Sequence, residues 1–163
     1  MNDELFWKLI KQSRRGTEDG EAQAEKLTSL LAKLEPSEIV AFDELLAKRR
    51  NEAYRWDLWA VAYIINGGCS DDGFEYFRCW LIAQGREFFE ATLKNPEHAA
   101  KRIEVGDEAE CEDLLYVAPK AYEIKTGQEL PPRKTKHLIR PKGKRWKEDE
   151  LENLFPKLCK RFS

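Results

Sequence analysis

Charged and polar side chains are interleaved with bulky apolar ones between residues 55 and 86 of this 163-residue chain. Three carboxylates of this stretch, Asp57, Asp71 and Asp72, have the chemistry of a general base or of a cation ligand. A general base with a second carboxylate beside it is suited to proton transfer near neutral pH, and Asp71 and Asp72 are neighbours in the sequence. No residue is assigned as catalytic, and these three are the candidates.

The same stretch carries guanidinium, amide, hydroxyl and indole groups that can bind an anion or an amine. The binding candidates are Arg55, Trp56, Asn66, Ser70, Arg78 and Arg86. A structural explanation competes with this one, because Ser70 and the two acidic residues after it are suited to cap a helix, and buried arginines need partners. The sequence leaves both explanations open.

Known catalytic and cofactor motifs are missing from the sequence. Residues 68–72 lack the final glycine of a nucleophile elbow, and there is no glycine-rich phosphate loop. The four cysteines are scattered and the two histidines are isolated, so the spacing of a zinc site does not occur. We therefore predict no metal, no cofactor and reduced thiols. Because no signal-like segment opens the chain, we also predict a cytoplasmic protein.

The elements that must position these groups are helical, since apolar residues recur at spacings of three and four and no alternating strand pattern occurs. Ten of the 18 aromatic residues lie between Tyr54 and Phe89. This density predicts an aromatic-rich antiparallel helical hairpin over about residues 52–93, which turns at Gly67 and Gly68. The predicted fold is an all-α, compact domain of about six to eight helices centred on that hairpin.

The net charge of -2 conceals a division of the chain into three segments. Residues 1–130 hold 17 basic and 26 acidic side chains, and we predict that they form an acidic helical domain. Residues 131–147, here called the basic arm, hold eight basic and no acidic side chains with three prolines, which predicts an extended segment. Residues 148–163 return to helical spacing, and we expect a C-terminal helix that packs on the domain.

The basic arm combines positive charge with an indole, a combination typical of sites for single-stranded nucleic acid. Its nucleic-acid candidates are Arg133, Lys134, Lys136, Arg140, Lys142, Lys144, Arg145 and Trp146. The alternative is that the arm lies over the acidic body, whose charge repels a polyanion. The sequence favours this alternative.

The hairpin and its flanks resemble a known bacterial family. The stretches that carry the resemblance are Tyr54–Trp59, Ile65–Phe74, Tyr76–Arg78 and Trp80–Arg86, with Phe6–Trp7, Leu9–Ile10, Ala121–Glu123 and Thr126–Gly127. Over roughly residues 1–130 they are similar to the family catalogued as domain of unknown function 4240. The resemblance implies no activity and no site residue, because the family has no established activity. Residues 131–163 lie outside it.

Three functions follow as hypotheses. The first is a non-catalytic cytoplasmic binding or interaction protein, of a regulatory or toxin-neutralising kind, whose partner is another protein. The second is an enzyme of unknown class with a polar site at the turn of residues 66–73. The third is non-specific nucleic-acid binding through the basic arm. No membrane partner is expected, because no run of about 18 apolar residues occurs.

Overall fold

A computed structural model describes all of residues 1–163. The chain forms nine α-helices and three 3-10 helices, with no β-strand. In chain order these are α1 (Asp3–Arg14), α2 (Gly20–Ala32), α3 (Pro36–Glu52), α4 (Trp56–Ile65), α5 (Asp71–Ala83), α6 (Arg86–Lys94), η1 (Pro96–Arg102), η2 (Glu112–Tyr116), α7 (Val117–Thr126), η3 (Glu148–Glu150), α8 (Leu151–Leu154) and α9 (Pro156–Phe162). The prediction of an all-α fold is confirmed, with slightly more helices than the six to eight expected. None of the helices combines the length and the apolar character that crossing a membrane requires.

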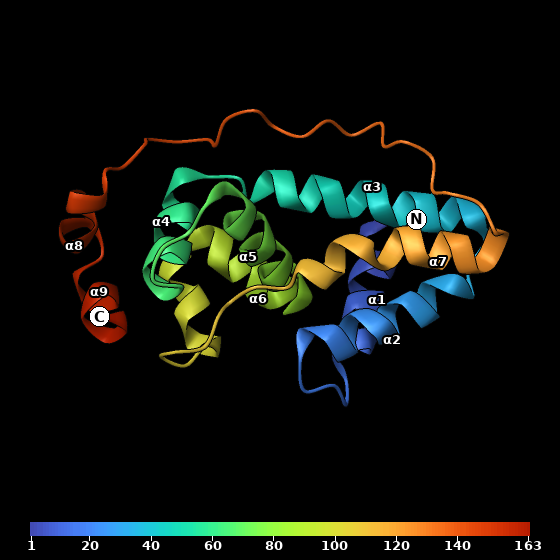
Figure 1. The fold of residues 1–163 in the computed structure, drawn as a ribbon, viewed down its shortest axis with the longest axis horizontal. Helices are drawn as coiled ribbons and strands as arrows, with labels where there is room; N and C mark the ends of the chain where they lie inside the picture. The colour runs from blue at the N-terminus through green and yellow to red at the C-terminus, as the bar shows by residue number, and fades with distance from the viewer.

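Helix α5 is the central element, because it contacts α1, α3, α4 and α6. Helix α7 packs on both α2 and α3. It lies at the end of the molecule opposite α8 and α9, as Figure 1 shows. One contiguous apolar core joins these helices, and it is rich in aromatic rings. Its largest fully buried side chains include Phe6, Phe42, Phe74, Phe77 and Phe89.

The central hairpin differs from its predicted bounds in both of its arms. Helix α4 begins at Trp56 rather than near Glu52, because the backbone is extended at Arg55 (φ -135°, ψ 144°). The second arm is two helices, since Gly85 has a φ of +103° and interrupts the helical backbone between α5 and α6. The turn between α4 and α5 lies at the predicted pair of glycines.

The C-terminal helix that the sequence pattern predicts is divided into α8 and α9. The division lies at Phe155, because the ring of Pro156 blocks a continuous helix while it suits the first position of a new one. Leu151 and Leu158 are buried in the main core, whereas Leu154 is 55% exposed. The interrupted helical pattern therefore does not give one continuous buried face.

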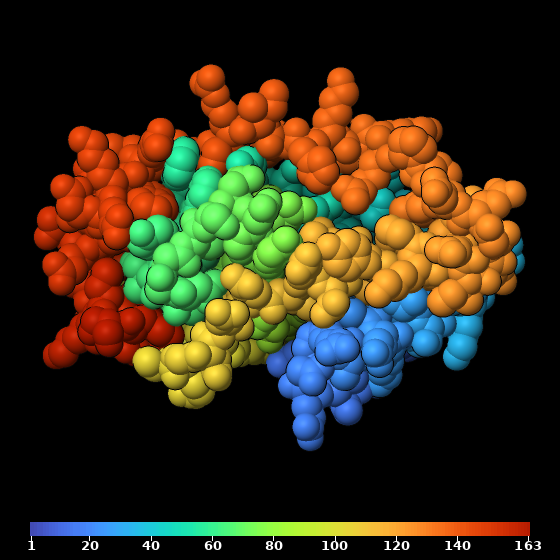
Figure 2. Space-filling model, viewed as in Figure 1, coloured from blue at the N-terminus to red at the C-terminus, as the bar shows by residue number.

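The basic arm runs along the outside of α3 towards α4 without forming a helix, as the orange segment of Figure 1 shows. Helices α8 and α9 follow it, and α9 packs on α4. Arg161 of α9 donates to the carbonyls of Ala100 and Ile103, both at 2.7 Å, and so attaches the chain end to η1. In Figure 2 the arm and these helices form one continuous border of the molecule.

A substitution of Gly85 tests whether its backbone conformation is needed for the break between α5 and α6. Its φ of +103° strains any residue with a Cβ atom, so we expect Gly85→Ala to lower the free energy of unfolding by about 1–3 kcal/mol. Gly73 is the matched control, because it lies within α5 and an added Cβ would meet no atom closer than 3.4 Å. Gly73→Ala is expected to be neutral or stabilising by up to about 1 kcal/mol. Urea unfolding followed by circular dichroism measures both, and equal losses would contradict the interpretation.

Candidate functional site

The start of α4 is held by Arg55, the residue just before the helix. Its Nε donates to Oδ1 of Asp57 at 3.0 Å and its Nη2 donates to Oδ2 at 2.7 Å. Its Nη1 donates to the carbonyl of Leu93 at 2.9 Å, near the end of α6. The Leu58 amide also donates to Oδ1 of Asp57 at 2.8 Å. Arg55 therefore ties the first turn of α4 to α6, and both oxygens of Asp57 are engaged.

The basic arm is joined to the body by backbone hydrogen bonds at this same turn. The amide of Trp56 donates to the carbonyl of Lys142, and the amide of Lys142 donates to the carbonyl of Tyr54, both at 2.9 Å. Arg55 and Lys142 thereby form an isolated parallel β-bridge. Such a bridge needs extended backbone on both sides, which explains why α4 begins only at Trp56.

Trp146 anchors the end of the basic arm. Its indole Nε1 donates to the carbonyl of Trp56 at 2.7 Å. Its ring packs edge-on against Trp56 and Tyr63, with centroids 6.2 and 5.4 Å away. Trp56 in turn stacks on Trp59 at 5.2 Å with an interplanar angle of 6°. Aromatic pairs of this kind contribute about 0.5–1.5 kcal/mol each beyond their burial.

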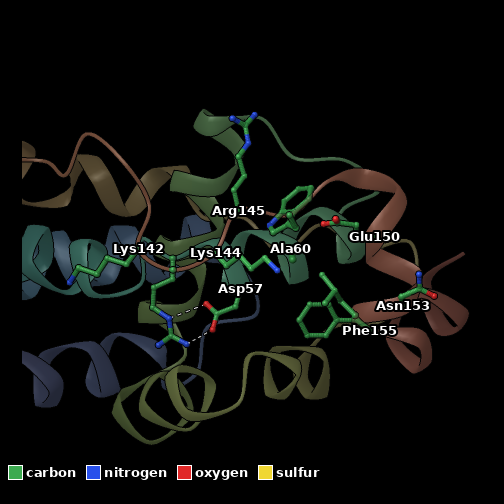
Figure 3. A pocket seen from close by; sticks show the side chains of 12 residues that line it. Asp57, Ala60, Lys142, Lys144, Arg145, Glu150, Asn153 and Phe155 are labelled. Carbon is green, nitrogen blue, oxygen red and sulfur yellow. Dashed lines mark hydrogen bonds and ion pairs between the residues drawn. The ribbon is translucent and has the colours of Figure 1, made fainter.

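A cleft of about 560 Å³ opens between the start of α4, the end of the basic arm and helix α8. This volume is within the range of about 300–1,000 Å³ typical of ligand sites. The residues that line it are Arg55, Asp57, Ala60, Lys142, Gly143, Lys144, Arg145, Trp146, Glu150, Asn153, Leu154 and Phe155. We call it the composite cleft, because its lining joins α4 to the tail of the chain (Figure 3).

The charges of the composite cleft favour an anionic ligand. Four basic and two acidic residues line it. Of the two acids, Asp57 is paired with Arg55, and Glu150 accepts a hydrogen bond from the Lys147 amide at 2.9 Å. Lys144 makes no ion pair. A free ammonium group therefore stands beside carboxylates that the chain already engages.

The side chains in the cleft have distinct directions. In Figure 3 the Lys144 side chain points into the cleft, whereas Lys142 and Arg145 point away from it. The Arg145 guanidinium carbon lies 5.4 Å from the centroid of the Trp56 ring, a cation–π arrangement. Phe155 lies across the cleft from Asp57. The cleft thus offers one cation, Lys144, opposite an apolar wall.

Two polar residues at the turn between α4 and α5 accept hydrogen bonds from backbone amides. Oδ1 of Asn66 accepts from the Ala109 amide at 2.9 Å and so fixes the loop that follows η1. Oγ of Ser70 caps α5 by accepting from the Gly73 amide at 3.1 Å. Ser70 thus caps a helix as the structural explanation proposes, whereas the Asn66 side chain holds a loop.

Asp71 and Asp72 occupy the first turn of α5, where the helix dipole favours negative charge. Oδ1 of Asp71 accepts from the Tyr54 hydroxyl at 2.9 Å, and this bond contributes, after burial, to a raised pKa of Tyr54. Asp72 is exposed. Residues 66–73 line none of the principal cavities, so the structure does not bring Asp57 together with Asp71 and Asp72 in one cleft.

Arg78 belongs to the core rather than to a surface site. It is 7% exposed, and its Nη1 donates to the carbonyl of Arg50 at 3.0 Å. Its guanidinium lies 4.4 Å from the centroid of Tyr54 and 4.9 Å from that of Phe74. Burial lowers the pKa of Arg78 from its usual value. The side chain joins α3 to α5 and is not available to a ligand.

Arg86 lies apart from the other binding candidates. It is exposed in the first turn of α6, where its Nε donates to Oε1 of Glu90 at 2.9 Å. It lines a different cavity from Arg55, between α6 and α1.

Groups for metal or thiolate chemistry are not assembled. No group of three or more His, Cys, Asp and Glu side chains is placed to hold a metal ion. The four cysteines are free. Burial raises the pKa of the thiols of Cys69 and Cys79 to about 12 and that of Cys111 to about 11, so thiolates are scarce at neutral pH.

The first part of the basic arm is bound to α3 through two carboxylates. Nε of Arg133 donates to Oδ2 of Asp43 at 2.7 Å, and Asp43 is only 2% exposed. Glu44 accepts from the amides of Lys134 and Thr135, at 2.6 and 2.9 Å, and from the Thr135 hydroxyl. Arg133 is therefore occupied by the body of the protein.

The middle of the arm has fewer contacts. Nδ2 of Asn51 donates to the carbonyl of Lys136 at 2.8 Å, and the Leu138 amide donates weakly to Oδ1 of Asn51 at 3.4 Å. Arg140 is exposed, and its side chain makes no hydrogen bond or ion pair. The nucleic-acid candidates are thus spread along the arm, with four of them beside the composite cleft.

The wall that α8 contributes is missed by the sequence patterns. Glu150, Asn153, Leu154 and Phe155 line the cleft, yet their helical spacing suggests an ordinary core helix. Pro156 is the signal that identifies them, because a helix interrupted after Phe155 cannot keep one continuous buried face.

Glu44 provides a pH test of arm docking. The Thr135 hydroxyl is the main cause that lowers the pKa of Glu44 below its ordinary 4.5, while burial opposes it. Because docking lowers this pKa, the contribution of Glu44 to docking is complete above the ordinary pKa and is lost as pH falls through the lowered one. We expect Thr135→Val to raise the pKa of Glu44. The amide proton of Lys134, followed by NMR against pH, measures the midpoint.

A suitable control is Thr28→Val, since the Thr28 hydroxyl donates to the Ala24 carbonyl and does not contact Glu44. Its midpoint should equal that of the unchanged chain. If Thr135→Val also leaves the midpoint where it was, the proposed contact between arm and α3 does not form in solution.

A comparison with known proteins matches only some of the residues that line the composite cleft. No curated protein and no solved structure matches the chain. The family model described as "Protein of unknown function (DUF4240)" matches residues 1–124, slightly less than the expected 1–130. Arg55, Asp57 and Ala60 lie within the matched residues, whereas every other residue of the cleft follows them. Since the match covers most of the 163 residues and the whole central hairpin, the chain belongs to this family of proteins of unknown function.

Proposed function

We propose that this protein is a non-catalytic binding protein of the cytoplasm, and that the composite cleft holds an acidic segment of a partner protein. The observation that carries the proposal is the charge of the cleft, into which the Lys144 ammonium points without an ion-pair partner, beside two carboxylates that the chain itself already engages. Complementary charge of this kind guides association and selects among partners.

The apolar wall supports a peptide segment as the ligand. Leu154, which is 55% exposed, lies next to Phe155 in the lining of the cleft. Three of the six exposed large hydrophobic residues belong to the tail of residues 131–163, namely Leu138, Ile139 and Leu154. A leucine or phenylalanine of the partner would bury Leu154, and each Å² of apolar surface removed from water contributes about 25 cal/mol.

The origin of the lining residues supports a ligand specific to this chain. The family region supplies Arg55, Asp57 and Ala60, which form a platform, and the tail supplies Lys144 and the apolar wall. We therefore infer that residues of the tail determine which partner binds, whereas the family region holds the tail in position.

The enzyme hypothesis gains less support. Asp57 and Glu150 are the carboxylates that line the cleft, but the Arg55 guanidinium engages both oxygens of Asp57, and Glu150 accepts from the Lys147 amide. Asp71 accepts from a tyrosine hydroxyl at a turn without a principal cavity. These placements favour binding over catalysis.

Nucleic-acid binding also gains less support. The Trp146 indole is held by a hydrogen bond to Trp56 and by two edge-on aromatic contacts, so stacking on a base would require it to leave the body. Arg133 is paired with buried Asp43, and separating them would leave an uncompensated carboxylate.

The proposal is tested with a fluorescein-labelled peptide of glutamates with one leucine and one phenylalanine, titrated by fluorescence anisotropy. We expect saturable binding by the full chain. Lys144→Glu should weaken it at least about tenfold, or about 1.4 kcal/mol, because the cation in the cleft is reversed. Leu154→Ser should also weaken it, since the apolar wall is lost. Both side chains are exposed, so both variants should keep their fold.

Arg140→Glu is the matched control, because it makes the same charge reversal on the same arm outside the cleft. It should bind the peptide nearly as tightly as the unchanged chain. Equal losses in Lys144→Glu and Arg140→Glu would show that the peptide responds only to overall charge. Absence of saturable binding to the unchanged chain would show that the cleft does not take an acidic peptide.

A further inference from the structure

A second cavity, of about 610 Å³, lies where α1 meets the junction of α5 and α6. It shares no residue with the composite cleft. We call it the basic groove, because basic side chains dominate its lining. The lining comprises Glu4, Trp7, Lys8, Lys11, Arg14, Arg15, Gln84, Gly85, Arg86, Glu87, Phe88 and Arg102.

Helix α1 and its C-cap residue supply four of these basic residues. Lys8, Lys11 and Arg14 follow one another at spacings of three, which place their side chains on the same side of the helix, and Arg15 caps its end. All four are exposed, and none of them makes an ion pair. Like charges at these spacings repel one another and oppose helix formation.

The facing side of the basic groove adds further positive charge. Arg102 lies 4.4 Å over the ring of Phe88, and its Nη1 donates to the carbonyl of Gln84 at 2.9 Å. These contacts hold the guanidinium at the wall without a carboxylate partner. Burial lowers the pKa of Arg102 and the charge of Arg14 lowers it further, whereas Glu87 opposes the change.

The acidic residues of the basic groove do not balance this charge. Its lining holds six basic side chains and two acidic ones, Glu4 and Glu87, and Arg86 is paired with Glu90 outside the lining. The imbalance is local, because residues 1–130 as a whole carry 17 basic and 26 acidic side chains. Five cations without an ion-pair partner therefore converge on one cavity of an otherwise acidic body.

We propose that the basic groove binds a small molecule that carries two or more phosphate groups. A compact polyanion would relieve the repulsion among the cations of α1 and Arg102, and arginine matches phosphate oxygens in a two-point geometry. The volume suits a small ligand. Trp7 and Phe88 are only 6% and 4% exposed, so recognition acts through the phosphates rather than through stacking on these rings.

The acidic surroundings argue against a polymer as the ligand. A nucleic-acid strand would extend beyond the cavity over a body with nine excess negative charges, whereas a small polyanion fits within the groove. This ligand is independent of the partner segment proposed for the composite cleft, and either site can be tested without the other.

The experiment is isothermal titration calorimetry of the full chain with inorganic pyrophosphate, repeated with ATP and with a DNA duplex. We expect saturable, one-to-one binding of pyrophosphate that weakens as salt is added. The double variant Lys11→Glu, Arg14→Glu should weaken binding at least about tenfold, because two cations of the groove are reversed. These side chains are exposed, and circular dichroism verifies that the helix content is kept.

The control is Lys48→Glu, Lys125→Glu, which changes the net charge equally at exposed lysines outside the groove. Its affinity for pyrophosphate should match that of the unchanged chain. ATP binding lost in the same double variant would identify nucleotides as one source of the phosphates, and pyrophosphate binding alone would identify inorganic or other small polyphosphates. The proposal is overturned by absence of saturable pyrophosphate binding, by equal weakening in the control, or by DNA binding that pyrophosphate cannot displace.

Discussion

Two backbone hydrogen bonds between Lys142 and the segment from Tyr54 to Trp56 determine how the rest of the tail is placed. They require extended backbone just before α4, and this requirement sets the first residue of that helix. Trp146 then reaches the carbonyl of Trp56 and continues the aromatic stack of the hairpin. These hydrogen bonds, together with the buried Leu151 and Leu158 and the contacts of Arg161 with η1, form a joint that places the tail beside the composite cleft.

The joint also explains how one chain combines a shared domain with a distinct surface. The family region contains the central hairpin and the platform of the cleft, and the tail contributes most of the lining. On its way the basic arm pairs Arg133 with Asp43 and donates two backbone amides to Glu44. Near its end, Lys144 points into the composite cleft and remains to face a partner. The net charge of -2 thus conceals two cavities, the composite cleft and the basic groove, whose linings hold more basic than acidic residues.

The sequence predicts the helices well, because apolar spacing and glycine turns are local signals. The turn at Gly67 and the cap at Ser70 are read correctly for this reason. The composite cleft is predicted only in part. Arg55 and Asp57 are recognised as polar residues of the hairpin, but the contact of Arg55 with Leu93 and the bridge to Lys142 join segments far apart in the chain. No local pattern encodes such contacts, so the approach of the tail to α4 is visible only in the folded chain.

The basic groove illustrates the same limit. Lys8, Lys11 and Arg14 can be placed on one helix face from their spacing, yet the approach of Arg102 depends on the break at Gly85 and on the path of η1. In contrast, the buried position of Arg78 follows from its aromatic neighbours, and a charged residue among so many rings is a signal of internal pairing.

The central claim, that the basic arm is docked on the body through Lys142 and Trp146, is tested most directly by hydrogen exchange of the Lys142 amide in the full chain. The docked arm predicts that this amide exchanges much more slowly than in a synthetic peptide of residues 136–148, and that Trp146→Ala removes most of the difference. Exchange of the Lys142 amide at the rate of the free peptide would contradict the docked arm and, with it, the composite cleft.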